Sequence, residues 1–281
     1  MKVLITGAAG QLGSELARTA EADEIVQTDA AELDITDRQA VEAFVGKIKP
    51  GMIFNCAAMT DVDLCEEEQE AAFRVNALGP RNLAMAAAAA DAALLHISTD
   101  YVFPGGGGAP LCEWDTPDPR TVYGKSKLLG ERYVSAFCPK HFIVRTSWLY
   151  GPDGGNFVKT ILRAARDKGA LKVVVDQRGC PTYTADLIAH LLKLAGTKEY
   201  GLYHCAGNGE CTWYEFACKI IALSGIPCEV SPCTAAEFPR PAPRPAYSVL
   251  RNTMLRCTVG DGMRPWEDAL ADFIHRYGGT L

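Results

Sequence analysis

The feature that most restricts how this chain can fold is the alternation of short apolar runs with helical patterns over its first half. Short apolar runs bounded by polar or glycine residues are typical of strands buried in a parallel sheet. We expect strands in five such runs, at residues 3–6, 24–28, 52–55, 93–98 and 141–145. Strands that alternate with helices form a sheet covered on both faces. The sequence therefore predicts an α/β fold, a doubly wound parallel sheet of the Rossmann type.

Helices are expected between these strands. One follows the first strand and places Leu12 and Leu16 on one face. A second opens at residues 36–39, where Thr-Asp-Arg-Gln has the form of a capping box. One long helix is expected from about Glu66 into the alanine-rich tract 84–93, because alanine is the best helix former.

The second half of the chain is organised differently. Beyond Tyr150 the alternation loosens, and the segment 239–245 is rich in proline. We expect residues 1–150 to be mainly a dinucleotide-binding domain. Residues 151–281 are expected to form mainly a smaller, loop-rich C-terminal substrate lobe, with some segments returning to the first domain.

Three glycines spaced by two residues, Gly7, Gly10 and Gly13, follow the first strand and open the first helix. Glycines let the backbone turn tightly there, and the helix N-terminus offers free N–H groups to phosphates. A plain strand-to-helix turn is the alternative, but the position at the first strand of an alternating chain favours a dinucleotide site. Gln11 and Leu12, which lie within the turn, belong to this predicted cofactor site.

Asp29 ends the second predicted strand, where a carboxylate accepts hydrogen bonds from the ribose hydroxyls of adenosine. It would also repel a 2′-phosphate, and residues 30–36 contain no Arg or Lys to receive one. This favours NADH, although a basic residue from elsewhere in the fold would reverse the preference. Asp34 and Ile35 are expected beside the adenine, with a solvated turn as the alternative for Asp34.

Tyr123 and Lys127 are four residues apart in a segment expected to be helical, so their side chains share one face. A nearby ammonium favours phenolate over phenol, and we therefore expect the pKa of Tyr123 to be lowered. Such a phenol can give or take a proton in carbonyl and alcohol chemistry. The pair alone is common on helix surfaces, but with the glycine turn it predicts an oxidoreductase site.

Composition excludes several other classes of protein. The net charge of −6 argues against nonspecific binding of nucleic acid, which needs a basic surface. No apolar run is long enough to cross a bilayer, and the start of the chain lacks the layout of a signal peptide, so we expect a cytoplasmic protein. The eleven cysteines include no Cys-x-x-Cys pair, which favours free thiols in a reducing compartment over zinc sites or disulfides.

Further motifs carry a resemblance to a known family. The glycine turn, Asn-Cys-Ala-Ala at 55–58 and the segment from Tyr123 to Lys127 resemble the extended short-chain dehydrogenase/reductase family. More specific motifs extend nearly end to end, at 98–103 (Ser-Thr-Asp-Tyr-Val-Phe), 145–150, 156–160, 176–182 (Asp-Gln-Arg-Gly-Cys-Pro-Thr), 201–204, 213–217 and 244–248. These are similar to the dTDP-4-dehydrorhamnose reductases within that family.

The resemblance implies NADPH- or NADH-dependent reduction of the C4 ketone of dTDP-4-dehydro-L-rhamnose to dTDP-L-rhamnose, a step toward cell-surface polysaccharide. It implies that Tyr123 is the general acid, that Lys127 holds the nicotinamide ribose, and that Thr99 polarises the ketone. A small-residue cofactor loop is implied at Ala57 and Ala58. The residues implied on the substrate side are Thr99, Val62, Asp100, Trp148, Asn156 and Arg244.

Several of these roles have alternatives. Thr99 is also suited to cap a turn, and Trp148 to core packing. Asp100 either orients Thr99 or contacts the sugar. Arg244 is expected at the diphosphate, but the family often has two adjacent arginines here and this chain has Pro243 before it. Asn76 resembles a buried structural amide of the family.

The predicted partners are a dTDP-linked deoxyketosugar and, at most, a second copy of the chain, as a monomer or homodimer. Some family members are described as metal-linked dimers, but Ala185 stands where a carboxylate ligand is expected, so we predict no metal. A nucleotide-sugar epimerase or dehydratase is an alternative on the same fold. The dehydratases carry a Glu after the Asp, where this chain has Tyr101. A noncatalytic regulatory subunit, similar to that of methionine adenosyltransferase, is the third possibility.

Overall fold

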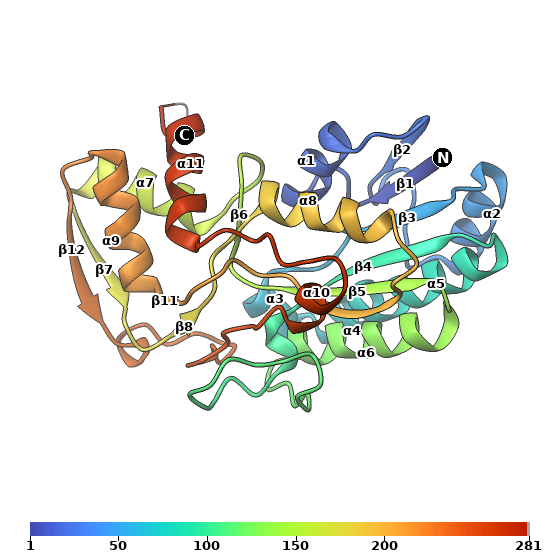
Figure 1. Ribbon diagram of the computed structural model, residues 1–281. Coiled ribbons are helices and arrows are strands. Elements are labelled where there is room, and N and C mark those ends of the chain that lie inside the picture. The colour runs from blue at the N-terminus through green and yellow to red at the C-terminus, as the bar shows by residue number, and fades with distance from the viewer. Residues whose placement is uncertain (280–281) are drawn as a thin grey trace.

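A six-stranded parallel sheet forms the centre of the computed structural model, which describes residues 1–279 (Figure 1). Its strand order is β10-β5-β4-β3-β1-β2. The strands are β1 (Lys2–Thr6), β2 (Glu24–Thr28), β3 (Met52–Asn55), β4 (Ala93–Thr99), β5 (His141–Thr146) and β10 (Gly201–His204). All five strands expected from the apolar runs are present, so the predicted Rossmann-type α/β sheet is confirmed. The sixth, β10, comes from the second half of the chain and pairs with β5.

Helices cover both faces of this sheet. On one face, α1 (Gln11–Thr19) and α8 (Thr184–Ala195) pack with apolar side chains of β1 and β3 in one core cluster. On the other face lie α2 (Arg38–Ile48), α5 (Gly79–Ala89) and α6 (Val122–Phe137), whose buried residues form a second cluster. The sheet is therefore buried on both sides, which explains why its strands read as continuous apolar runs.

Two local predictions on these helices are wrong. Helix α2 has Asp37 as its N-cap, whose side chain accepts a hydrogen bond from the Ala40 N–H, so residues 36–39 form no capping box. The long helix expected from Glu66 is divided into α3 (Val62–Glu67), α4 (Gln69–Phe73), a π-helical turn (Arg74–Leu78) and α5. Pro80 at the start of α5 lacks an N–H, so regular α-helical hydrogen bonding cannot run through this point.

The second half of the chain adds a smaller body with its own core (Figure 1). Its helices are α7 (Phe157–Lys168), α9 (Trp213–Ser224) and α11 (Trp266–Tyr277). Strand β7 (Ala170–Val174) pairs in parallel with β12 (Glu229–Cys233). Short strand pairs join neighbouring segments: β6 (Leu149–Tyr150) with β9 (Thr182–Tyr183), and β8 (Arg178–Gly179) with β11 (Cys211–Thr212). Helix α10 (Thr253–Thr258) contacts β10.

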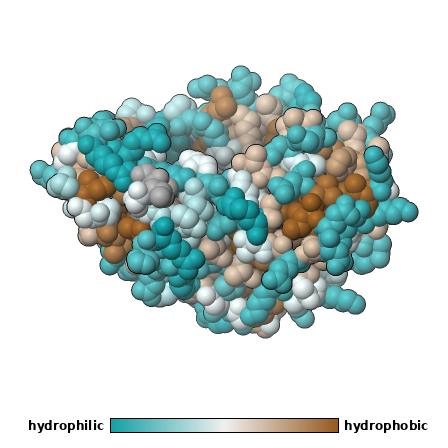
Figure 2. Space-filling view, turned by 90° about the horizontal axis from the view of Figure 1, so that it is seen from above, coloured by the Kyte–Doolittle hydropathy of each residue, from teal (hydrophilic) through white to brown (hydrophobic). Residues whose placement is uncertain are grey.

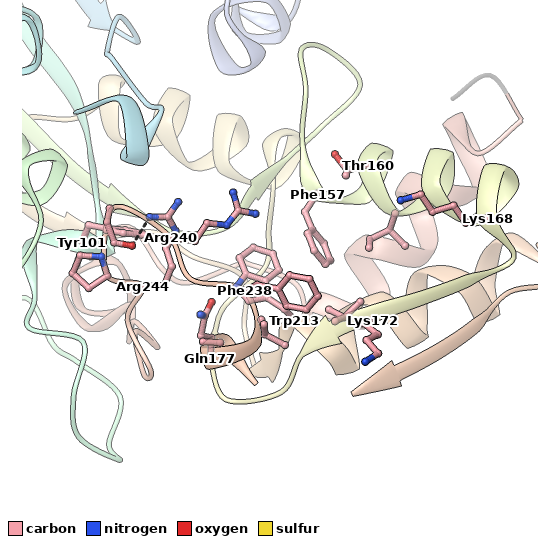
Figure 3. A pocket seen from close by; sticks show the side chains of 16 residues that line it. Tyr101, Phe157, Thr160, Lys168, Lys172, Gln177, Trp213, Phe238, Arg240 and Arg244 are labelled. Atoms are coloured by element: carbon pink, nitrogen blue, oxygen red, sulfur yellow. Dashed lines mark hydrogen bonds between the residues drawn. The ribbon is translucent and has the colours of Figure 1, made fainter. Parts of the chain in front are cut away.

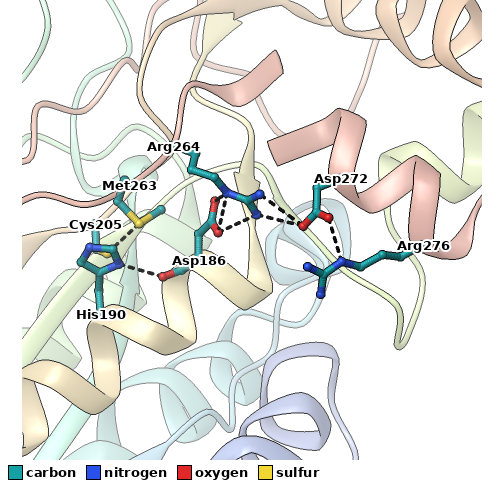
Figure 4. Close-up of polar contacts among 7 residues, drawn as sticks. All are labelled: Asp186, His190, Cys205, Met263, Arg264, Asp272 and Arg276. Atoms are coloured by element: carbon teal, nitrogen blue, oxygen red, sulfur yellow. Dashed lines mark hydrogen bonds and ion pairs between the residues drawn. The ribbon is translucent and has the colours of Figure 1, made fainter. Parts of the chain in front are cut away.

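A row of alternating charges connects α8 to the C-terminal helix α11 (Figure 4). Arg264 pairs with Asp186 of α8 at 2.7 Å and with Asp272 of α11 at 3.2 Å, and Arg276 pairs with the same Asp272 at 2.7 Å. Both carboxylates are mostly buried, so these contacts are screened less than pairs at the surface. The row therefore links a helix on the main sheet to a helix of the smaller body.

Most of the surface seen from above is hydrophilic, and hydrophobic residues gather in separate patches (Figure 2). Within the described residues, no helix combines the length and apolar character needed to cross a membrane. All eleven cysteines are free thiols, as the sequence predicted.

Candidate active site

The glycine turn lies between β1 and α1, where the backbone packs too closely for side chains. Gly7 has a φ of +69°, and a Cβ at this position would lie 2.6 Å from the Ala57 nitrogen. A Cβ at Gly13 would lie 2.1 Å from the Gly7 carbonyl oxygen. Glycine is therefore required at both positions, because β1, β3 and α1 meet there. Gly10 is the N-cap of α1 and has no side-chain capping bond, so the N–H groups of the first turn point to open space.

A cavity of about 250 Å³ lies beside this turn. Its walls include predicted cofactor residues from three strand ends, namely Gly7, Gly10, Asp29, Asp34, Ile35, Ala57 and Ala58. Asp29 accepts a hydrogen bond from the Ala9 N–H at 2.6 Å, which holds the carboxylate next to the glycine turn. Asp34 accepts from the Thr36 N–H at 2.8 Å and so also has a turn-forming role. The lining includes no Arg or Lys.

A second cavity, of about 450 Å³, continues from the first, since Gly10, Cys56 and Ala58 line both. The predicted residues that line it are Gln11, Leu12, Gly13, Val62, Thr99, Asp100, Tyr123, Lys127 and Trp148. The structure thus gathers residues from the ends of β1, β3, β4 and β5 and from α6 around one groove. An elongated groove with carboxylates at one end, an uncapped helix N-terminus in the middle and a Tyr–Lys pair at the other fits a dinucleotide.

Tyr123 is half-buried in the wall of this second cavity, one turn from Lys127 on α6. Burial raises the pKa of the Tyr123 phenol well above its usual value, and a hydrogen bond with Thr99 offsets only part of that rise. The expectation of a lowered pKa is therefore wrong, because the loss of hydration on burial is the largest effect on this phenol. A raised pKa keeps the phenol protonated at neutral pH, which is the form that a proton donor needs.

Thr99 lies at the carboxyl end of β4, next to Tyr123. Its hydroxyl donates to Asp100 Oδ1 at 3.0 Å and accepts from the Tyr101 N–H at 3.2 Å. Thr99 thus caps the turn that follows β4, and its hydroxyl is held by Asp100, while its contact with the ketone stays a prediction. Burial raises the pKa of the Asp100 carboxyl to about 6, and hydrogen bonds from Ser248 and Thr99 offset part of that rise.

Lys127 is almost completely buried, and its ammonium donates to the Ile97 carbonyl oxygen at 2.6 Å. That is its one protein acceptor in the described chain, so two of its three donors remain for a ligand in the groove. Burial lowers the pKa of Lys127 to about 8, while the negative charge of Glu131 acts in the opposite direction. By contrast, Lys125 on the neighbouring face is exposed.

A charged network that was not predicted from the sequence lies next to Lys127 on α6. Glu131, one turn further along α6, receives two hydrogen bonds from Arg145 of β5, at 2.9 Å and 2.7 Å, and one from the Ser98 hydroxyl. Glu131 and Arg145 are both nearly fully buried, and Arg145 also contacts His204 at 3.4 Å. The sequence did contain a signal for this ion pair. An arginine within an apolar strand needs a buried anion. Glu131, four residues from Lys127, lies on the same face of the helix and could supply it.

Two predicted substrate residues have structural partners instead of open positions. Asn156 caps α7 through the Lys159 N–H, and its amide donates to Gln11 and to the Gly151 carbonyl oxygen, so it does not line the cavity. Arg244 donates to Asp63 at 2.8 Å and to the Ala242 carbonyl oxygen at 3.0 Å. The prediction for Asn76 is correct, since its side-chain amide is fully buried. The amide oxygen accepts from the Met59 N–H at 2.9 Å, and the amide nitrogen donates to the Met59 carbonyl oxygen at 3.0 Å.

A third cavity, of about 790 Å³, opens between α7, β7 and the proline-rich segment (Figure 3). Aromatic rings of Phe157, Trp213 and Phe238 line it, together with the side chains of Arg240 and Arg244. Tyr101 and Trp213 line both this cavity and the 450 Å³ cavity, so the two spaces are neighbours. In the part of the chain that the structure covers, no group of His, Cys, Asp and Glu side chains is arranged to hold a metal ion.

Comparisons with known proteins agree with this arrangement. Residues 1–278 match the family model described as the RmlD substrate binding domain. The dTDP-4-dehydrorhamnose reductase of Streptomyces griseus is 43% identical, over 96% of this chain and 91% of that protein. A dTDP-4-dehydrorhamnose reductase structure from Clostridium acetobutylicum superposes with a TM-score of 0.97, at 49% identity, covering 99% of this chain and 100% of that one.

The structure of dTDP-4-dehydrorhamnose reductase from Bacillus anthracis in complex with NADP has a TM-score of 0.96, at 43% identity, over 98% of this chain and 99% of that one. The family model and these relatives span nearly the whole chain. The chain therefore belongs to the RmlD family of dTDP-4-dehydrorhamnose reductases.

Proposed function

We propose that this protein reduces the C4 ketone of dTDP-4-dehydro-L-rhamnose to dTDP-L-rhamnose with NADPH or NADH. The observation that carries the proposal is the common position of Tyr123, Thr99 and Lys127. All three line a cavity that continues into a groove suited to a dinucleotide. Family membership supports the same reaction.

Bound NADPH or NADH supplies the hydride for the carbonyl carbon. The chain supplies the proton and the positions of the reacting groups. Tyr123 is the proposed general acid for the C4 oxygen, because burial keeps its phenol protonated. Thr99 lies beside it and is held by Asp100, which fixes the hydroxyl near the ketone.

Lys127 is the proposed ligand of the nicotinamide ribose. Its side chain lines the groove, and its ammonium is anchored by the Ile97 carbonyl oxygen, which leaves two donors for the ribose hydroxyls. A fixed positive charge next to the phenol also stabilises the tyrosinate that remains after proton transfer.

The nucleotide part of the substrate is proposed to occupy the 790 Å³ cavity. Its aromatic lining suits the thymine ring, and Arg240 and Arg244 suit a diphosphate, since a guanidinium matches phosphate oxygens. Arg244 is bound to Asp63 at 2.8 Å, so the carboxylate holds it at the edge of this space. The sugar then extends past Tyr101 and Trp213 toward Tyr123.

The adenosine end of the groove supports NADH as the better cofactor. Asp29 is held beside the glycine turn, and the 250 Å³ cavity is lined by no cation. A 2′-phosphate would meet this carboxylate without a partner for its charge. Arg74 donates to the Thr36 hydroxyl at 3.5 Å, and Arg18 lines a neighbouring cavity that Asp29 also borders, but neither side chain lines the 250 Å³ cavity.

The test is an assay of purified protein with the ketosugar nucleotide and each cofactor, followed by absorbance of the reduced nicotinamide. The reductase proposal predicts stoichiometric oxidation of the cofactor and formation of dTDP-rhamnose. Tight copurifying cofactor that is not consumed would point instead to an epimerase or dehydratase. No turnover with either cofactor, together with copurification of a catalytic partner, would favour the regulatory-subunit alternative.

We further propose a cytoplasmic location and a monomer or homodimer. The eleven free thiols support a reducing compartment. Gel filtration with light scattering measures the oligomeric state.

A further inference from the structure

The motif at residues 176–182 contains a glycine whose role the reaction does not explain. Gly179 is in β8, with a backbone conformation open to any residue, so no turn requires it. A Cβ built at this position would lie 2.5 Å from Cε2, 2.6 Å from Nε1 and 2.8 Å from Cζ2 of Trp148. Carbon atoms in contact need about 3.5 Å. The missing side chain therefore leaves the space that the Trp148 indole occupies.

Trp148 is itself held in an uncommon conformation. Its φ is +46°, in the left-handed region that residues other than glycine rarely adopt. Such a backbone persists only where its surroundings impose it, and it is enriched at ligand sites. Here the Trp148 carbonyl oxygen accepts from the Thr182 N–H at 3.2 Å, and the adjacent Ser147 hydroxyl donates to the Cys180 carbonyl oxygen at 2.8 Å. The segment after Gly179 thus fixes the backbone of Trp148.

The indole of Trp148 is stacked on the indole of Trp213. Their ring centroids are 3.4 Å apart and the planes differ by 5°. Trp213 is the first residue of α9, and Phe157 supports it from α7 at 4.4 Å between centroids. Pairing of β8 with β11 places Gly179 opposite Cys211, two residues before Trp213. The same strand pair therefore brings together the glycine and the second tryptophan.

The tryptophan pair lies where two cavities meet. Trp148 lines the 450 Å³ cavity that contains Tyr123, and Trp213 lines both that cavity and the 790 Å³ cavity. Tyr101 is the other residue that lines both. A ligand that spans the two spaces would pass along Tyr101 and Trp213, the residues that the two cavities share. A displaced Trp148 would change the shape of the sugar cavity and would also move the wall of this passage.

We propose that Gly179 is a positioning residue, which keeps Trp148 flat on Trp213 so that the pair forms the wall between the sugar and nucleotide subsites. This inference rests on the proposed reductase function. It assigns the glycine of the 176–182 motif to recognition of the nucleotide sugar. Gly179 contacts neither substrate nor cofactor and acts through Trp148.

The test compares Gly179→Ala with Gly46→Ala, a matched variant on α2 where an added Cβ meets nothing within 4 Å. Gly179→Ala should raise KM for the nucleotide sugar about tenfold or more, the loss expected when an aromatic wall is misplaced. Its affinity for NADH or NADPH should change much less, because the adenosine half of the cofactor is expected in the 250 Å³ cavity, which Trp148 does not line. Gly46→Ala should match the parent protein in both measurements.

A spectroscopic readout separates the stacked geometry from activity. Two stacked indoles produce an exciton couplet in far-ultraviolet circular dichroism, and Trp213→Phe assigns it to this pair. The couplet should be lost or reduced in Gly179→Ala. If that variant is too unstable to purify, Gly179→Ala with Trp148→Phe should restore folding, because the smaller ring makes room for the methyl group, and KM should remain raised.

The outcomes distinguish the two proposals. A parent protein that does not turn over the ketosugar contradicts the reductase function but leaves the couplet test intact. An active parent with an unchanged couplet and unchanged KM in Gly179→Ala would overturn the positioning role. Failure of the smaller ring to restore folding of an unstable Gly179→Ala variant would also overturn it, because the clash with Trp148 would then not be the cause.

Discussion

The charge of Glu131 is predicted to set the pH range over which the enzyme works. Lys127 is buried, and its pKa is about 8 because the loss of hydration outweighs the attraction of Glu131. Glu131→Gln keeps the shape of the side chain and removes that attraction. The pKa of Lys127 should then fall further, since an opposite charge close to an ionisable group shifts it by about 1–3 units.

The direction and size of the expected change in activity follow from the protonation state in which Lys127 binds the nicotinamide ribose. The protonated lysine is the active form, so activity is lost as pH rises through its pKa. If the pKa falls from about 8 to about 7, the protonated fraction at a pH of about 8 drops about fivefold. At a pH of about 6 the two proteins should differ little, because the lysine is protonated in both.

The assay is the pH profile of kcat/KM for the nucleotide sugar. Ser98→Ala is the control, because it removes one hydrogen bond to Glu131 but keeps the negative charge, so its basic limb should match that of the parent. Glu131→Gln leaves Arg145 buried without its anion, which should cost about 3–5 kcal/mol of stability. The measurement is therefore made well below the melting temperature.

If Glu131→Gln proves too unstable, the double variant Glu131→Gln with Arg145→Gln removes the unpaired buried cation as well. The basic limb of its pH profile should still shift to lower pH. A folded Glu131→Gln protein whose basic limb coincides with that of the parent would show that the Glu131 charge does not control the protonation of Lys127.

Three further predictions concern other parts of the structure. Gly13→Ala should cost about 1–3 kcal/mol and weaken cofactor binding, because its Cβ would lie 2.1 Å from the Gly7 oxygen; thermal unfolding and cofactor titration measure this. Asp63→Asn should tighten binding of dTDP by up to about fivefold in calorimetry, since it releases Arg244 from an ion pair that contributes up to about 1 kcal/mol. Arg264→Met should lower the free energy of unfolding by about 1–2 kcal/mol in denaturant titration, because Asp186 and Asp272 lose their shared partner. Unchanged stability and cofactor affinity in Gly13→Ala would contradict the first prediction. Unchanged dTDP affinity in Asp63→Asn would contradict the second, and an unchanged free energy of unfolding in Arg264→Met the third.

The sheet could be predicted from the sequence because its signals are local. Each strand is a short apolar run, and the glycine turn marks the first crossover to a helix. The strands at 52–55 and 141–145 are observed at Met52–Asn55 and His141–Thr146. By contrast, β10 joins the sheet from the second half, and no local pattern indicates which edge it takes.

The interrupted helix shows where local propensity failed. Residues from Glu66 onward favour a helix, but Asn76 has to reach Met59 and Ser126. Helix α6 also packs so closely that a Cβ at Gly130 would lie 2.2 Å from the Asn76 carbonyl oxygen. These tertiary contacts, together with the missing N–H of Pro80, favour the π-helical turn over a regular helix.

Within the site, the sequence identified the reactive side chains, but it did not show how burial changes their pKa values or which partners they have. The Tyr123–Lys127 spacing correctly placed both side chains at one cavity. The pKa of the phenol was predicted in the wrong direction, because the depth of burial is not encoded in spacing. The partners of Arg244 and Asn156 were missed for the same reason, since Asp63 and Gln11 are distant in sequence.

The proposed reaction depends above all on the Tyr123 phenol, which delivers the proton to the substrate. The most direct test is the rate of cofactor oxidation by Tyr123→Phe at saturating ketosugar and cofactor, with cofactor affinity measured separately. We expect kcat to fall at least about 100-fold, the usual contribution of a positioned general acid, with cofactor binding retained. A Tyr123→Phe protein that reduces the ketosugar at nearly the parent rate would contradict it.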